Sequence, residues 1–439
     1  MKKYDEYKDS GVEWIGEVPK HWEVIPLKFT GAFGNGLTYS PKDVVDNGIL
    51  VLRSSNIQNS SLSFEDNVYV SKVSRDLLVN KGDVIICSRN GSAALVGKSA
   101  FVDKELNATF GAFMMRYIPN IDKKYGFYLF QTAIGQYKGY FSTTTINQLT
   151  KTTIGEIKIP LAMAEEQTAI ATYLDTHCAK IDNLISIQQK RIALLQELKQ
   201  SVITHAVTNG LNPNVEMKQS GVEWIGDVPK HWEVTKMNNN CSTITDYVAS
   251  GSFADLRKNV LYLDEPDYAM LIRTADLSSN DRKLPPVYIS KCSYEFLSNS
   301  NLFGGEVVLP NIGASIGNVY MVPKLYKHMS LAPNAIMVKS YGNDRFLYYY
   351  FKSKPGVDSL MLIGMAAAQD KFNKTELRSL KVLVPPLGEQ AAIASYLDHK
   401  CATIDTSISN AQHQIELLQE YKQSLITEVV TGKRKVTDN

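Results

Sequence analysis

Polar side chains that can pair with the edges of DNA bases occur in two groups along this 439-residue chain, each where a presumed strand ends. Arginine, asparagine, glutamine and lysine supply the hydrogen bonds that distinguish base pairs in the major groove. We predict DNA contacts at Arg53, Ser54, Asn56, Arg89, Asn90, Ser92, Gln148 and Lys151, and at Arg273, Thr274, Asn311, Ser315, Gln369 and Lys371. The alternative is that Asn and Ser act here only as turn formers.

Two short patterns could indicate catalysis instead. The segment GSAALVGKS at residues 91–99 is similar to a phosphate-binding loop, but five residues separate its two glycines where that motif requires four. Pro266 and Asp267, followed by Asp281 and Lys283, imitate the acidic residues and lysine of metal-dependent nucleases. A stand-alone, metal-dependent DNA endonuclease is therefore the alternative function, although the first half of the chain has no counterpart of these residues.

Methyl transfer lacks its sequence motifs. The chain contains no NPPY or DPPY tetrapeptide to hold a flipped adenine and no glycine-rich FxGxG segment for S-adenosylmethionine. Its seven histidines form no HxxxH or HExxH pattern, so no metal site is predicted. We expect no catalytic residue and no cofactor in this chain.

The elements that position these side chains are present twice. SGVEWIGEVPKHWEV at residues 10–24 returns as SGVEWIGDVPKHWEV 210 residues later (220 − 10). EEQTAIATYLDTHCAKIDNLI from Glu165 returns as GEQAAIASYLDHKCATIDTSI from Gly388, 223 residues later (388 − 165). The segments between these repeats differ from one another. A repeated framework with different contents predicts two different surfaces presented in the same way.

Two long helices are predicted from apolar residues spaced by three, four and seven, at residues 166–207 and 389–430. Proline precedes each helix, and glycine follows each. At 42 residues, each would be about 63 Å long. Because one small domain cannot bury such helices, we predict that they pair as a coiled coil. The second variable segment begins near the far end of the first helix, which predicts an antiparallel pair; the alternative is a parallel pair, in which the second domain would have to reach back along the full length. The tryptophans of the repeated VEWIG segments are expected to pack as caps on the domains.

Short β-rich runs separated by Gly, Asn and Ser predict mixed α/β structure in both variable segments, with helices at residues 125–137 and 345–351. The predicted fold class is therefore α/β, with two mixed domains joined by two long antiparallel helices in a pseudo-two-fold arrangement. The predicted boundaries are a first domain at 1–158, a helix at 159–208, a linker at 209–216, a second domain at 217–383, a helix at 384–431 and a tail at 432–439.

Composition is that of an ordinary globular protein, with 44% hydrophobic and 21% charged residues. A net charge of +2 means that DNA would have to meet local basic patches. Five cysteines without a CxxC pair argue against a disulfide framework. With no apolar run long enough for a membrane span and no readable signal peptide, we expect a cytoplasmic location.

The paired VEWIG segments, the paired EQxAIAxYLD helix entries and their order along the chain resemble the specificity subunits of type I restriction-modification systems over the full length. The resemblance implies two target-recognition domains that read a bipartite, double-stranded DNA site without doing chemistry. It also implies two methyltransferase subunits and restriction/translocase subunits as partners, with S-adenosylmethionine, ATP and magnesium bound there. The helices would set the spacing of the half-sites at about one to two DNA turns, so a change in helix length should change the spacer.

Overall fold

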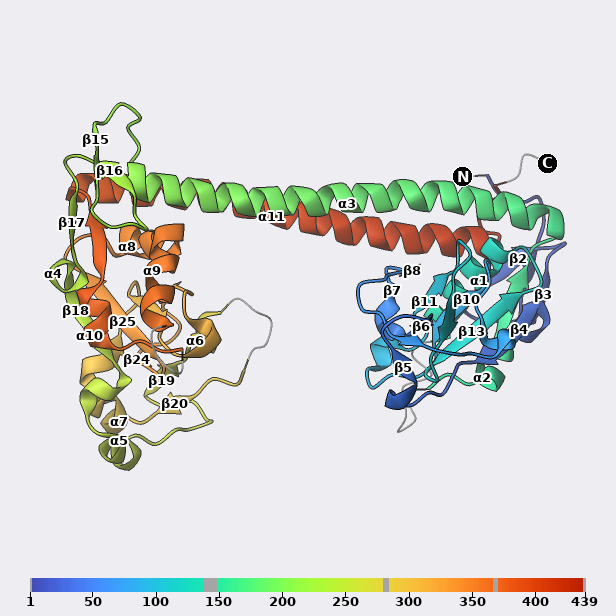
Figure 1. The fold of residues 1–439 in the computed structure, drawn as a ribbon, viewed down its shortest axis with the longest axis horizontal. Coiled ribbons are helices and arrows are strands. Elements are labelled where there is room, and N and C mark those ends of the chain that lie inside the picture. Colours follow the sequence, from blue (N-terminus) through green and yellow to red (C-terminus); the bar gives the residue numbers. More distant parts are fainter. Residues whose placement is uncertain (1, 138–147, 279–283, 366–369, 437–439) are drawn as a thin grey trace. The chain divides into compact units, whose positions relative to one another are not determined.

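The computed structural model describes residues 2–137, 148–278, 284–365 and 370–436. The chain folds as two compact units, each of which combines distant parts of the sequence. Unit 1 contains residues 1–188 and 413–439, and unit 2 contains residues 189–412. Each unit therefore holds the start of one long helix and the end of the other (Figure 1).

Unit 1 is built on two four-stranded sheets. The first has the order β11-β10-β13-β4 and is antiparallel throughout; the second has the order β12-β6-β9-β5, with β12 parallel to β6. The strands are β4 (Gly31–Asn35), β5 (Val44–Val45), β6 (Ile49–Leu52), β9 (Tyr69–Val70), β10 (Val84–Cys87), β11 (Ser99–Phe101), β12 (Ala108–Phe110) and β13 (Met114–Pro119). Three small antiparallel pairs add β1 (Tyr7–Asp9) to β2 (Glu17–Pro19), β3 (Glu23–Pro26) to β14 (Lys158–Leu161), and β7 (Ile57–Gln58) to β8 (Ser61–Leu62). Helices α1 (Lys123–Tyr137) and α2 (Lys151–Gly155) complete it.

Unit 2 has the same first sheet and the same parallel pair, but the fourth strand of its second sheet, β21, lies beside β24, at the opposite edge from β5 in unit 1. Its sheets have the orders β18-β25-β22-β23 and β20-β19-β24-β21, and again one pair, β19 with β24, is parallel. The strands are β18 (Cys241–Asp246), β19 (Ala269–Ile272), β20 (Tyr288–Ile289), β21 (Asn301–Leu302), β22 (Val307–Pro310), β23 (Tyr320–Met321), β24 (Met329–Leu331) and β25 (Ala335–Ser340). β15 (Met217–Gln219) pairs with β16 (Asp227–Pro229), and β17 (Glu233–Lys236) with β26 (Lys381–Val384). Its helices are α4 (Met237–Asn240), α5 (Phe253–Asn259), α6 (Thr274–Leu277), α7 (Lys291–Phe296), α8 (Asp344–Lys352), α9 (Lys354–Gly364) and α10 (Lys374–Ser379).

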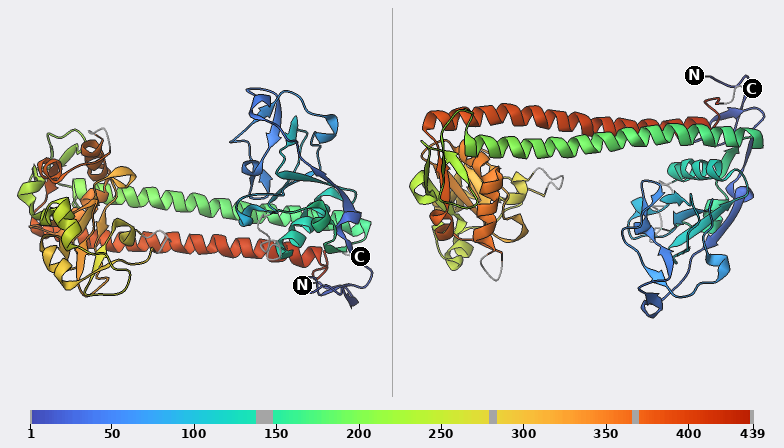
Figure 2. Two further views of the ribbon diagram at one scale, coloured as in Figure 1. Left: turned by 90° about the horizontal axis from the view of Figure 1, so that it is seen from below. Right: turned by 45° about the horizontal axis from the view of Figure 1, so that its top comes forward.

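The two long helices are α3 (Ala164–Asn209) and α11 (Leu387–Val430), and they lie side by side within each unit (Figures 1 and 2). In unit 1, Lys422 Nζ of α11 is 2.7 Å from the Asp182 carboxylate of α3. In unit 2, Lys199 Nζ of α3 is 2.6 Å from the Asp405 carboxylate of α11. These four residues are equivalent in pairs, 223 residues apart. The predicted helices and their antiparallel pairing are confirmed, as is the mixed α/β class.

Equivalent joints connect the start of each long helix to its unit. In unit 1, Trp22 is fully buried and its indole Nε1 donates to Glu166 at 2.8 Å, in the first turn of α3. In unit 2, Trp232 donates to Glu389 in the first turn of α11 at 2.9 Å. In unit 1, the chain that leaves the end of α11 also packs on the Trp22 ring, since a Cβ added at Gly432 would come within 3.2 Å of that ring. The expected caps therefore hold both helices together.

The main core of unit 1 lies between α1, the start of α3 and the end of α11, which contributes Leu425, Ile426, Val429 and Val430. The predicted helices at residues 125–137 and 345–351 are present as α1 and α8. Each sends a tyrosine to the neighbouring long helix, where Tyr128 donates to Asp175 and Tyr349 to Asp398, both at 2.7 Å. These contacts orient the sheets of each unit against its helix pair.

Candidate nucleic-acid interface

Three segments of unit 1 that are distant in sequence converge beside the ends of β6 and β10. Leu149 N donates to Ser88 O at 2.7 Å, and Arg89 forms an antiparallel backbone bridge with Gln148. The Asn90 side chain donates to Ser54 Oγ at 3.4 Å, which connects the end of β10 to the end of β6. The structure thus brings four of the predicted DNA contacts into one cluster.

Unit 2 assembles part of its predicted set in the same way. Asn311 Nδ2 donates to Phe372 O at 2.8 Å, and Phe372 N donates to Asn311 O at 3.1 Å. Ile312 forms an antiparallel backbone bridge with Lys371, so Asn311 and Lys371 lie together. Ser315 ends the short turn at residues 313–315 that follows β22. The predicted contact Gln369 lies outside the described residues.

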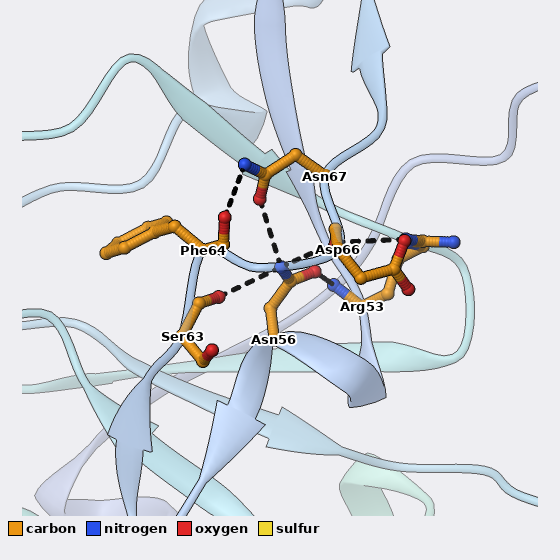
Figure 3. Close-up of polar contacts among 6 residues, drawn as sticks. All are labelled: Arg53, Asn56, Ser63, Phe64, Asp66 and Asn67. Carbon is orange, nitrogen blue, oxygen red and sulfur yellow. Dashed lines mark hydrogen bonds and ion pairs between the residues drawn. The ribbon is translucent and has the colours of Figure 1, made fainter. Parts of the chain in front are cut away.

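The two arginines that follow β6 and β19 are held by carboxylates instead of facing outward unpaired. Arg53 Nη2 is 2.8 Å from Asp66 Oδ1 (Figure 3), and the hydrogen bond from Arg53 lowers the pKa of Asp66. Arg273 donates to the Asp276 carboxylate from both Nε, at 2.9 Å, and Nη2, at 2.6 Å. These hydrogen bonds raise the pKa of Arg273. In both cases the guanidinium is bonded to a carboxylate of its own unit, Arg273 through Nε and Nη2 and Arg53 through Nη2.

Asn56 is an internal support. Its side chain is 1% exposed, accepts a hydrogen bond from Arg53 N at 2.9 Å, and donates to Ser63 O and Asp66 O at 3.0 Å each (Figure 3). A buried amide with this many partners has no free donor for DNA. Asn56 is therefore unavailable for the predicted base contact in this structure, because its side chain is already bonded to the loop that follows β8.

The remaining predicted contacts occupy short turns. Ser92 N donates to Asn90 Oδ1 at 3.0 Å in the turn after β10. Lys151 is exposed at the start of α2, and Thr274 is half-buried at the start of α6. Exposure leaves Lys151 and Ser92 available to a partner, whereas Thr274 belongs to the turn that the Arg273–Asp276 pair closes.

Sequence reasoning missed one side chain of the unit 1 cluster, Phe113. This residue precedes β13, is 60% exposed, and has the Arg89 guanidinium carbon 5.4 Å from its ring centroid. An aromatic residue directly before a strand is too common to be singled out in one sequence. Only the fold reveals that Phe113 lies beside Arg89.

Nothing in the described part of either cluster resembles a catalytic site. Burial raises the pKa of the Cys87 thiol at the end of β10, which keeps this thiol protonated and unreactive. Among the described residues, no three His, Cys, Asp or Glu side chains are grouped as metal ligands. Asp281 and Lys283 of the nuclease-like pattern lie outside the described residues. In the described part of the chain, no helix is both long and apolar enough to cross a membrane.

Comparison with known proteins decides the family. The profile of the type I restriction modification DNA specificity domain matches residues 19–197 and 248–417, one match in each half of the chain. This chain belongs to that family.

Curated relatives cover nearly the whole chain. The chain is 27% identical over 439 residues to a putative type I restriction enzyme MjaX specificity subunit of Methanocaldococcus jannaschii, covering 96% of each protein. It is 23% identical to the type I restriction enzyme EcoKI specificity subunit of Escherichia coli, covering 95% of this chain and 90% of the relative.

Solved structures share the fold. A chain from a study of complex assembly and conformational transition of the type I R-M system aligns with a TM-score of 0.69 at 14% identity, covering 94% of this chain and 98% of that one. The HsdS subunit of Thermoanaerobacter tengcongensis aligns with a TM-score of 0.50, also at 14% identity, over 95% and 98%. The family predicted from the repeated segments is confirmed.

Proposed function

We propose that this specificity subunit reads a bipartite DNA site, one half-site with each unit, and does no chemistry itself. One observation carries the proposal: the two units share the strand order of the first sheet, the parallel pair of the second and the same joints to the long helices, but have different side chains at equivalent strand ends. Two domains that recognise different base sequences need different side chains at the DNA, and these can be presented on the same backbone framework. Phosphate contacts from surface lysines would fix the register on the duplex.

The proposed partners are two methyltransferase subunits and restriction/translocase subunits, which would bind S-adenosylmethionine, ATP and magnesium. The apolar surface of the long helices supports this proposal. Leu184 and Tyr421 of unit 1 are 47% and 50% exposed, and Leu194 and Leu198 of unit 2 are 64% and 50% exposed. The three leucines recur along α3, and exposed apolar side chains that recur along a helix are typical of a surface that a partner covers.

The test is methylation sequencing of DNA from cells that express this chain together with its methyltransferase. We expect methylated adenines within one interrupted motif, and none when this chain is omitted. The purified chain alone, incubated with magnesium and plasmid DNA, should neither cut nor methylate. Magnesium-dependent cleavage that Lys283→Ala abolishes would contradict the proposal in favour of an endonuclease, and methylation without a bipartite motif would contradict the two-reader arrangement.

A further inference from the structure

A set of backbone hydrogen bonds at the strand ends is present in both units. In unit 1, Ser88 N donates to Phe113 O at 3.0 Å, and Leu149 N donates to Ser88 O at 2.7 Å. Leu149 is buried and anchors the segment before α2. Ser88 thus connects the end of β10, the residue before β13 and the segment before α2.

Unit 2 has the same bonds at equivalent positions. Asn311 N donates to Asn334 O at 3.3 Å, and Phe372 N donates to Asn311 O at 3.1 Å. Phe372 is buried as Leu149 is, and both lie 223 residues apart in sequence. The backbone framework is therefore the same, although the residues it carries are not.

Three exposed positions project from this framework, and we call them the reading trio. Each trio comprises the second residue after a strand (β10 or β22), the residue before the next long strand (β13 or β25), and the third residue before a helix (α2 or α10). The trio is Arg89, Phe113 and Gln148 in unit 1, and Ile312, Asn334 and Lys371 in unit 2. The backbone bridges Arg89–Gln148 and Ile312–Lys371 show that the positions correspond.

All six side chains are on the surface, and their chemistry differs at every position. Phe113 is 60% exposed and Ile312 is 47% exposed, although both are large and apolar. An arginine in one unit stands where the other has isoleucine, and a glutamine stands where the other has lysine. Since the backbone framework is shared and all six positions are exposed, the two units can differ here without a change of fold.

Arg89 is the arginine of unit 1 that is best placed to read a base. Its guanidinium carbon is 5.4 Å from the centroid of the Phe113 ring, a cation–π contact that restrains the position of the arginine side chain. Within the described residues it has no carboxylate partner, whereas Arg53 is paired with Asp66 and Arg273 with Asp276. An exposed arginine that a neighbouring ring restrains and that is not paired with a carboxylate is suited to a bidentate contact with guanine O6 and N7.

We propose that the reading trio determines base preference in each half-site. Arg89, oriented by Phe113, selects a guanine in the half-site of unit 1. Ile312, in the same position of unit 2, contacts the methyl group of a thymine, which is the apolar feature of the major groove. This inference rests on the proposed function, because it assigns the bases that each reader discriminates.

The first experiment compares Arg89→Ala with wild type in the methylation sequencing described above. We expect one guanine of one half-site to become degenerate, with discrimination against other bases reduced about 5- to 150-fold. The other half-site and the spacer should stay unchanged. Arg75→Ala is the matched control, because Arg75 is an exposed arginine of the same unit outside the trio, so the motif should be unaltered.

The second experiment separates positioning from contact. Phe113→Ala should relax the same guanine position as Arg89→Ala, because the arginine loses the ring that orients it. Phe113→Tyr keeps the ring and should preserve the wild-type motif. Relaxation at a different position of the motif would show that Phe113 does not act through Arg89.

The third experiment exchanges chemistry between equivalent positions. Arg89→Ile should replace the guanine preference with thymine in one half-site, and Ile312→Arg should do the reverse in the other. Assembly with the methyltransferase, measured by gel filtration, establishes that each variant is folded.

The outcomes distinguish this inference from the proposed function. A wild-type complex without a bipartite motif contradicts the proposed function. A bipartite motif that Arg89→Ala leaves unchanged contradicts the reading trio alone. An assembled Arg89→Ala complex that loses methylation altogether also contradicts it, since the trio is expected to select one or two bases and not to supply DNA binding as such.

Discussion

Asn56 is buried and Asn90 is half-buried, so single substitutions should distinguish a residue that supports the fold from one that contacts DNA. Asn56→Ala removes four hydrogen bonds of a buried amide, and Arg53 N and the carbonyl of Ser63 lose this partner. We expect the free energy of unfolding of unit 1 to fall by about 3 kcal/mol. Urea unfolding followed by tryptophan fluorescence measures this.

The control at the residue scale is Asn90→Ala. Asn90 is only half-buried, and it has one bond within a surface turn and one long bond of 3.4 Å to Ser54, so its loss should cost less than about 1 kcal/mol. If Asn56→Ala left stability unchanged but relaxed the methylation motif, Asn56 would be a base contact after all, and the loop shown in Figure 3 would open to expose it.

At the scale of elements, the start of α3 should depend on one of two adjacent glutamates. Glu166 accepts hydrogen bonds from buried Trp22 at 2.8 Å and from His21 at 3.1 Å, whereas neighbouring Glu165 is exposed. Both lie in the first turn, so both interact with the helix dipole. Glu166→Ala should lower the free energy of unfolding of unit 1 by about 2 kcal/mol more than Glu165→Ala, because only the former leaves a buried indole N–H unpaired. An equal fall in melting temperature for the two variants would contradict the stabilising role of the Trp22–Glu166 hydrogen bond.

The same scale shows what a single sequence can predict. The helices could be placed because their periodicity runs for about 40 residues and their caps occur twice, and the strands because β-rich runs end at Gly, Asn and Ser. For the polar clusters, the sequence predicted only that their residues lie at strand ends, and not which of them contact one another. The pairing of Arg53 with Asp66 is not visible in sequence, because a loop whose path is set by buried Asn56 brings the two together. The match of Arg89 to Ile312 is likewise hidden, since the segments around them differ.

At the scale of the whole molecule, unit 1 combines the N-terminal part of the chain with its C-terminal end, so its stability should depend on that end. Leu425, Ile426, Val429 and Val430 are at most 4% exposed in the core of unit 1, and Gly432 O accepts a hydrogen bond from Tyr7. Each such side chain contributes about 1.5–3 kcal/mol when buried. Removal of residues 424–439 should therefore cost on the order of 6–12 kcal/mol, comparable with the total stability of a typical domain.

We expect this truncation to unfold unit 1 while unit 2, which contains none of the removed residues, stays folded. Limited proteolysis with mass spectrometry should then detect new cleavage within residues 2–137 and continued protection of residues 217–278. Lys433→Ala, at an exposed side chain of the same segment, should leave the cleavage pattern as in wild type. Protection of residues 2–137 in the truncated chain would mean that the N-terminal domain folds as a continuous stretch of sequence. In that case the C-terminal end of α11 would only dock onto a finished domain, and the reading clusters would not depend on the far end of the chain.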